Sequence, residues 1–308
     1  MRRNLFSGFV TSFALCSACV SPDSEARFAI PAQPEGLSPA IPDILAGSSP
    51  LEWRSLDPET TLYMDFPQGR VVIEMAPDFA PNHVANVKTL AREGYFRNGA
   101  VTRVQDNYVA QWAQAAEPPR PPRLGAVTLK AEFVRRRDPA ISFDALPDPD
   151  TYAPEVGFSN GFPAGRDASE MWLAHCYGAV GVGRDNDPDS GGGTELYAII
   201  GHSPRGLDRN ITVLGRVVQG MEILSSLPRG PGAMGFFETP AGYTRYADIK
   251  VAADLPAGQR TDLEILRTDS ATFATLVNAR RWRKDDFYHN PPGRIGLCNI
   301  TVPSRLKS

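Results

Sequence analysis

Hydrophobic and polar residues alternate along several short stretches of this 308-residue chain, which is the pattern of half-buried β-strands. Two such runs, residues 62–66 and 70–75, flank a Pro-Gln-Gly turn and predict a hairpin. The same reasoning predicts further strands over residues 101–114, 178–184, 196–200, 211–218 and 249–251. Most of the predicted elements are strands, so the fold class is expected to be mainly β.

Helical spacing is clearest after the hairpin. Pro81 suits the first turn of a helix, and Gly94 fits the position after its end. Between them, Val84, Val87 and Leu90 share one face, which predicts an amphipathic helix. A shorter helix is expected over residues 221–227, where Pro228 stops it.

The first residues predict export. Arg2 and Arg3 precede a mostly apolar stretch, residues 5–15, and small residues follow, so residues 1–26 are interpreted as a secretory signal cleaved after Ala26. A lipid anchor at Cys19 is a second interpretation, because residues 16–19 resemble a lipobox, although Cys16 stands where Leu or Val is usual. An uncleaved segment is a third. The expected location is the periplasm, as a free protein or as a membrane-anchored lipoprotein.

Composition and charge narrow the alternatives. The net charge of -3 argues against a nucleic-acid-binding protein, which needs a basic face. Outside the signal, Cys176 and Cys298 are expected either to form a disulfide or to be two separate buried thiols, because sequence gives no distance between them.

Two patterns that would indicate bound ions are not matched by the sequence. A calcium loop beginning at Asp185 would need Gly at its sixth position and Glu at its twelfth, where the chain has Ser190 and Leu196. The histidines show no metal-binding spacing, and no serine elbow is present. No metal and no cofactor are therefore expected.

One strand carries a fixed charge among apolar residues. Arg103 alone is typical of a solvated strand edge, but Arg103, Tyr108, Val109 and Gln111 together resemble the pocket strands of the cyclophilin family of peptidyl-prolyl isomerases, which carry Arg, Phe, Met and Gln at this spacing. Residues 193–197 resemble the family's Gly-Ser-Gln-Phe-Phe block. Residues 207–208 and 213–217 resemble its Leu-Asp-Gly and Val-Phe-Gly-Arg-Val blocks.

This resemblance covers about residues 61–254 and implies a closed antiparallel β-barrel with two capping helices. It leaves three regions outside the family pattern. Residues 27–60 form a Pro/Ser-rich N-terminal extension. Residues 115–172 form an insertion that is turn-rich from residue 138 onward, and loops of such length tend to be functional or mobile. Residues 255–308 form a C-terminal extension with one helix capped by Ser270, too apolar to be free and so expected to pack on the domain.

The implied activity is the cis/trans isomerisation of X-Pro bonds in exported polypeptides, which assists folding, by a protein expected to be a monomer. By resemblance, Arg103 is the catalytic donor to the prolyl nitrogen and Gln111 holds the substrate backbone. Gly183 and Arg184 match the pair that meets the residues before proline. The residues implied to line the proline slot or its rim are Tyr108, Val109, Glu195, Tyr197, Leu207 and Ile211. For each of them ordinary core packing is the alternative.

Four departures from the family pattern qualify this picture, the first of them Thr102, which replaces the usual His before Arg103. Glu195 replaces a Gln and offers a carboxylate that could pair with Arg103, either orienting it or holding it away from substrate. Ile211 stands where many members have His or Tyr. Gly206 stands in the place of a Trp linked to cyclosporin binding, which predicts weak inhibition by cyclosporin. The alternative function is a peptide-binding or chaperone module of the same shape with little catalytic activity.

Overall fold

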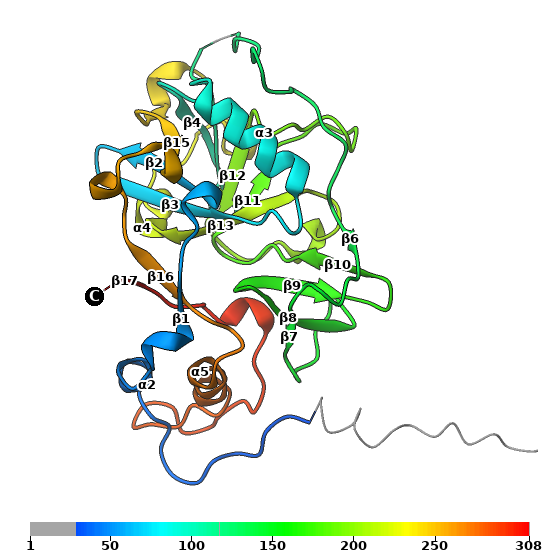
Figure 1. Cartoon of the computed structure of the whole chain (residues 1–308), viewed down its shortest axis with the longest axis vertical. Coiled ribbons are helices and arrows are strands. Elements are labelled where there is room, and N and C mark those ends of the chain that lie inside the picture. The colour runs from blue at the N-terminus through cyan, green and yellow to red at the C-terminus, as the bar shows by residue number, and fades with distance from the viewer. Residues whose placement is uncertain (1–28, 117, 308) are drawn as a thin grey trace, which may run out of the picture.

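The computed structural model describes residues 29–116 and 118–307, so the predicted signal segment and the candidate lipid anchor at Cys19 lie outside the described residues. A curled antiparallel sheet of nine strands forms the upper body in Figure 1. In spatial order its strands are β14 (Thr244–Arg245), β4 (Ala100–Val104), β5 (Val109–Ala113), β12 (Leu196–Ile199), β11 (Ala179–Val182), β13 (Val213–Gln219), β3 (Gly69–Met75), β2 (Thr61–Phe66) and β15 (Ile249–Val251).

The prediction of a closed barrel is wrong, because β14 and β15 stand at opposite ends of the sheet and share no ladder. These two strands are consecutive in the chain, and only residues 246–248 join them. The connection crosses the gap between the two edges: the backbone N–H of Ala247 donates to the carbonyl of Asp65 on one side, and its carbonyl accepts from the N–H of Asn98 on the other. Because residues 246–248 span the gap without forming a strand, no strand pairs across it, and the sheet remains an open half-barrel.

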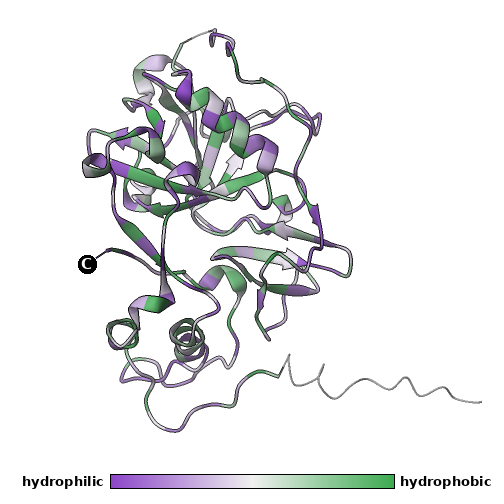
Figure 2. Cartoon of the chain, viewed as in Figure 1, coloured by the Kyte–Doolittle hydropathy of each residue, from purple (hydrophilic) through white to green (hydrophobic). Residues whose placement is uncertain are grey.

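Two helices pack on this sheet, as predicted. Helix α3 (Pro81–Arg92) begins with its proline at the first turn and buries Val84, Val87 and Leu90. These side chains join the main core together with apolar residues from the sheet, such as Leu62 and Trp112. Figure 2 shows the apolar positions concentrated along the strands. The short helix α4 (Met221–Ser225) adds Leu224 to the same core.

A second core lies below the sheet in Figure 1 and is built from three stretches far apart in the chain. Trp53 comes from the N-terminal region, Phe158 and Trp172 from the insertion, and Ile265 and Phe273 from the C-terminal region. The elements around it are α2 (Ile41–Ala46), β1 (Trp53–Ser55), β16 (Leu263–Leu266), β17 (Ser304–Leu306) and α5 (Ala271–Arg281). Ser270 caps α5 by accepting a hydrogen bond from the Phe273 N–H, as predicted.

The insertion is more regular than its turn-rich sequence indicates. It forms a five-stranded sheet in the order β6 (Arg135–Arg136), β10 (Glu170–Leu173), β9 (Phe162–Arg166), β8 (Glu155–Ser159) and β7 (Asp144–Ala145). Three of these strands are four or five residues long, and both faces contribute buried side chains to different clusters. Residues buried on both faces do not alternate with polar ones, so the period of two is absent from the sequence.

Cys176 and Cys298 form a disulfide across 122 residues of sequence, which decides between the two alternatives left open by the sequence. Cys176 precedes β11 of the large sheet, Cys298 lies in a short helical turn (Leu297–Asn299), and both cysteines belong to the second core. A cross-link that closes so long a loop restricts the unfolded chain strongly.

Replacing both cysteines by serine is expected to lower the free energy of unfolding by about 2–5 kcal/mol. Urea unfolding of the two proteins with and without dithiothreitol checks this. The unmodified protein should lose stability on reduction, whereas the double serine variant should not respond to the reductant. Equal midpoints for all four samples would contradict the prediction.

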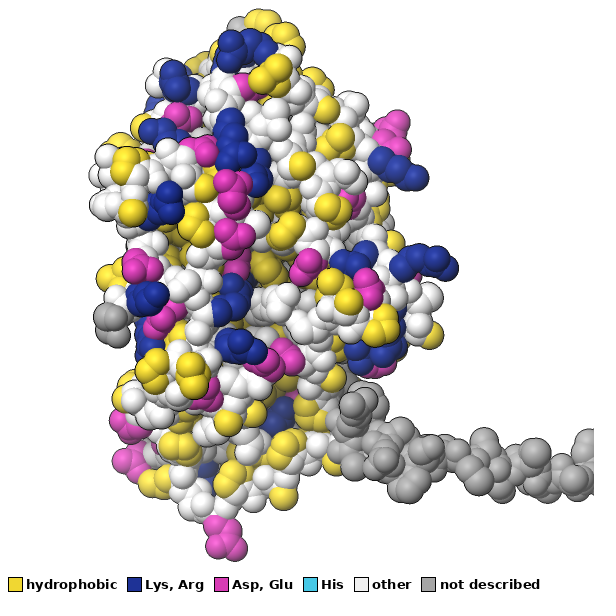
Figure 3. Space-filling view, in the orientation of Figure 1, with side chains coloured by type: hydrophobic (Ala, Val, Ile, Leu, Met, Phe, Trp, Pro, Cys, Tyr) yellow, Lys and Arg dark blue, Asp and Glu magenta, His cyan; other side chains and the backbone are white. Residues whose placement is uncertain are grey.

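Charges of both signs are interspersed on the face seen in Figure 3. Over α3, Lys88 and Arg92 pair with Glu59, and Arg92 also pairs with Asp254. Within residues 29–116 and 118–307, no helix has the length and apolar character needed to cross a membrane.

Candidate active site

The candidate site is built on one row of residues that runs across three neighbouring strands. Arg103 of β4 lies opposite Gln111 of β5, and Gln111 lies opposite Tyr197 of β12. Directly opposed residues project from the same face of a sheet. Their neighbours Ala110 and Leu196 project from the other face into the main core. The predicted residues therefore come together because the strand register places them on the face away from that core.

Arg103 is held in a fixed orientation by three hydrogen bonds. Its Nε donates to the carbonyl oxygen of Met234 at 2.7 Å, its Nη1 to Oε1 of Gln111 at 3.2 Å and its Nη2 to Oε1 of Gln105 at 2.6 Å. The guanidinium also lies over the rings of Tyr108 and Phe236, at 5.6 and 5.1 Å from the ring centres. A guanidinium has five N–H groups, so two of them have no acceptor among the described residues.

Partial burial weakens the preference of Arg103 for its charged form. Desolvation lowers the pKa of its guanidinium, and the nearby Tyr108 opposes this change. An arginine pKa starts so high that the group stays protonated near neutral pH. The site therefore holds a permanent positive charge in a partly dehydrated place, where its hydrogen bonds and field are stronger than in water.

Glu195 does not pair with Arg103. Its carboxylate instead accepts a hydrogen bond from Nε2 of Gln111 at 2.7 Å, and the other end of that amide accepts from Arg103. No Lys or Arg of the described chain lies within ion-pair distance of Glu195. Gln111 thus relays between the carboxylate and the guanidinium, and the carboxylate orients the amide so that its oxygen faces Arg103.

These residues line a cavity of about 460 Å³. Nine of the ten residues predicted from sequence border it: Arg103, Tyr108, Val109, Gln111, Gly183, Arg184, Glu195, Tyr197 and Ile211. Leu207 is the exception and is not among the lining residues. It ends the short turn Arg205–Leu207, whose orientation is fixed by the buried ion pairs that Arg205 makes with Asp150 and Asp208.

Sequence reasoning missed one wall of the cavity. Met234 and Phe236 come from a loop about 130 residues after Arg103. The backbone of Phe236 forms an isolated antiparallel β-bridge with that of Arg103. Met234 has a left-handed backbone with φ of 54°, which turns its carbonyl toward Nε of Arg103. Neither residue belongs to a periodic pattern, and both side chains are more than one-third exposed, so nothing in the local sequence marked them.

Comparisons with known proteins identify the family of this chain. The family model described as cyclophilin type peptidyl-prolyl cis-trans isomerase/CLD matches residues 61–240, which is more than half of the chain. The chain belongs to the cyclophilin family. As a member of that family it is a peptidyl-prolyl cis-trans isomerase, in agreement with the sequence-based prediction.

Similar proteins support the assignment. The probable peptidyl-prolyl cis-trans isomerases of Brucella suis and Brucella abortus are each 27% identical to this cyclophilin over 177 residues, covering 58% of its chain and 76% of theirs. The crystal structure of cyclophilin AquaCyp293 from Hirschia baltica is similar with a TM-score of 0.66 and 27% identity, over 88% of this chain and 98% of that one. At 88% of this chain, that likeness extends beyond residues 61–240.

The exposed position of Gly206 leads to a testable prediction about inhibition of this cyclophilin by cyclosporin. A Cβ atom at Gly206 would meet nothing within 4 Å, so a large side chain fits there. Cyclosporin is expected to inhibit the unmodified protein weakly, and Gly206→Trp is expected to strengthen inhibition by at least about tenfold, since a tryptophan is a frequent anchor of binding energy. Inhibition titrations of both proteins, with Gly206→Ala as control, measure this. Nanomolar inhibition of the unmodified protein would contradict it.

Proposed function

We propose that this cyclophilin isomerises X-Pro bonds of exported polypeptides and thereby assists their folding, with Arg103 as its central catalytic residue. The single observation that supports this best is the guanidinium of Arg103, which is fixed by three protein acceptors, keeps two further N–H groups and borders a cavity whose lining includes the apolar side chains of Val109 and Ile211. An aimed donor beside an apolar slot is what this reaction needs.

The chemistry requires neither a nucleophile nor a metal. Amide resonance gives the X-Pro bond a rotation barrier of about 18–20 kcal/mol. A donor at the prolyl nitrogen localises the nitrogen lone pair and removes it from that resonance. Acceleration by roughly 10⁵-fold corresponds to about 7 kcal/mol. A preorganised guanidinium and a held ring supply terms of this size through electrostatics and orientation.

In the proposed binding mode the proline ring enters between Tyr108, Val109, Tyr197 and Ile211. The amide of Gln111 contacts the backbone of the substrate, and Gly183 and Arg184 meet the residues before proline. Leu207 keeps its predicted place at the rim as a proposal only, since it lies outside the cavity lining.

NMR exchange spectroscopy with a short Ala-Pro peptide and residues 27–308 tests this proposal. Fast cis/trans exchange, together with shifts of the Val109 and Ile211 methyl signals, is the expected result. Exchange that stays at its spontaneous rate while the methyl signals shift would favour the second candidate function, a peptide-binding or chaperone module. One observation favours that candidate: three of the five donors of Arg103 are already bound to protein oxygens.

Export is a separate part of the proposal and has its own test. Residues 1–26, fused to a reporter enzyme that is active only outside the cytoplasm, should give activity in a Gram-negative host. Mass spectrometry of the mature protein then separates the alternatives. A chain that begins at Arg27 indicates simple secretion, and a lipid-modified Cys19 that is lost in Cys19→Ser indicates an anchor. A chain that still begins at residue 1 in the cytoplasm would overturn export.

A further inference from the structure

The side chain of Tyr197, which forms one wall of the cavity, is held at its hydroxyl end by a buried histidine. Tyr197 is only 5% exposed, and its ring lies so close to Gly181 that a Cβ atom there would be 2.2 Å from the phenol oxygen. That oxygen lies 3.0 Å from Nε2 of His175, and the two rings are nearly parallel, at 13°. Tyr197 stands where the family block resembled by residues 193–197 has Phe, so this hydroxyl is a feature of the present chain.

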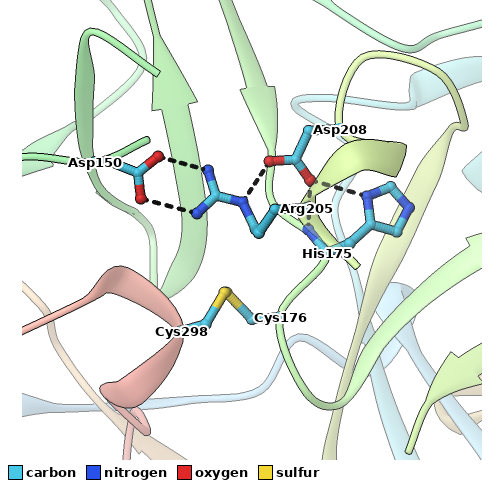
Figure 4. The surroundings of a disulfide bond; sticks show 6 residues. All are labelled: Asp150, His175, Cys176, Arg205, Asp208 and Cys298. Carbon is cyan, nitrogen blue, oxygen red and sulfur yellow. Dashed lines mark hydrogen bonds and ion pairs between the residues drawn. A yellow bond between two sulfur atoms is a disulfide. The ribbon is translucent and has the colours of Figure 1, made fainter. Parts of the chain in front are cut away.

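His175 is itself fixed by a buried carboxylate. It is fully buried, and Oδ1 of Asp208 lies 3.1 Å from its Nδ1 and accepts its backbone N–H at 2.8 Å (Figure 4). A carboxylate only accepts hydrogen bonds, so Nδ1 carries the proton. In the tautomer whose proton is on Nδ1, Nε2 is an acceptor and the hydroxyl of Tyr197 donates to it. In that tautomer the hydrogen bonds run in one direction from Tyr197 to Asp208.

The chain of contacts continues into the insertion. Oδ2 of Asp208 accepts from Nε of Arg205 at 2.5 Å, and the other side of that guanidinium donates to both oxygens of Asp150, at 3.0 and 3.1 Å (Figure 4). Arg205 and Asp208 are buried, at 6% and 7% exposure, and Asp150 belongs to the insertion. Cys176, next to His175, carries the disulfide to Cys298.

We propose that His175 is a positioning residue for isomerisation: through the hydroxyl of Tyr197 it fixes the ring that forms one wall of the proline slot. His175 does not touch the substrate. Asp208, Arg205 and Asp150 hold His175 in turn, so the width of the slot depends on a residue of the insertion. This inference rests on the proposed role of Tyr197 in the slot.

A double-mutant cycle tests the proposal. Tyr197→Phe removes the hydroxyl, and His175→Asn keeps a donor for Asp208 but does not reach Tyr197. Each variant is expected to lower kcat/KM for an Ala-Pro peptide roughly three- to tenfold, the range for one buried hydrogen bond. The double variant should be no worse than either single one, because both remove the same bond. His202→Asn, an exposed histidine, is the control and should behave like the unmodified protein.

A second readout separates positioning from general destabilisation. Peptides with the six-membered pipecolic acid in place of proline report the fit of the ring. Both single variants should discriminate less between proline and pipecolic acid, whereas a purely structural role would leave this ratio unchanged. Multiplying effects in the double variant, or an unchanged ratio, would overturn the proposal. If Tyr197→Ala also left kcat/KM for Ala-Pro unchanged, then the proposed slot itself, and not only the role of His175, would be wrong.

Discussion

Replacing Arg103 by Ala is expected to lower kcat/KM for X-Pro isomerisation by roughly 10²- to 10³-fold, the usual loss when one preorganised electrostatic donor is removed. The guanidinium borders the cavity, and two of its N–H groups have no acceptor among the described residues. Arg103→Lys should recover little of the activity, because an ammonium cannot bond Met234, Gln111 and Gln105 in one plane and still face the substrate.

NMR exchange on an Ala-Pro peptide measures both variants. Arg136→Ala is the matched control, because Arg136 is exposed on β6 and makes no ion pair with any residue that the structure describes. The control should retain full activity. Catalysis within about threefold of the unmodified protein in a folded Arg103→Ala variant would rule out the guanidinium as the central catalytic group.

The largest loss of stability is expected from Arg281→Met. Arg281 of α5 and Asp148 of the insertion form an ion pair of 2.5 Å in which each side chain is only 2% exposed. Asp148 also accepts the backbone N–H of Ile295, so it ties together two of the stretches that build the second core. Removing the arginine leaves a buried carboxylate without its cation, which costs about 3–5 kcal/mol.

Urea unfolding followed by fluorescence gives this loss directly. Arg283→Met is the matched control, since its pair with Asp285 is exposed and such pairs contribute about 0–1 kcal/mol. The double variant Asp148→Leu with Arg281→Met should recover part of the loss, because it leaves no unpaired charge but removes the acceptor of the Ile295 N–H. If Arg281→Met and Arg283→Met unfold at the same urea concentration, the buried pair does not stabilise the second core.

Local patterns predicted the elements of the large sheet well. The hairpin of β2 and β3, helix α3 and the capped helix α5 are all present close to their predicted bounds, because each carries a period or a cap readable within about a dozen residues. Register then explains the site. Once β4, β5 and β12 pair, Arg103, Gln111 and Tyr197 must share a face.

What the sequence could not reveal depends on contacts between distant residues. The prediction of a closed barrel was wrong because pairing of the two edge strands depends on how the connection between β14 and β15 crosses the gap. Met234 meets Arg103 through a backbone carbonyl, which has no side-chain signature. The role of Gln111 between Glu195 and Arg103 likewise required distances, since sequence alone suggested a direct pair between Glu195 and Arg103.

The second core is expected to fold after the large sheet, because its parts come from distant stretches of the chain. Trp53 of β1 pairs with Leu266 of β16, and Phe158 of β8 packs edge to face on Phe273 of α5. Chains emerge from the ribosome from the N-terminus, so all strands of the large sheet are available before residue 260 is made. Pairs so distant in sequence form slowly because a long loop must close first. We therefore expect newly made chains to expose Trp53, Phe158 and Trp172 until the last fifty or so residues arrive.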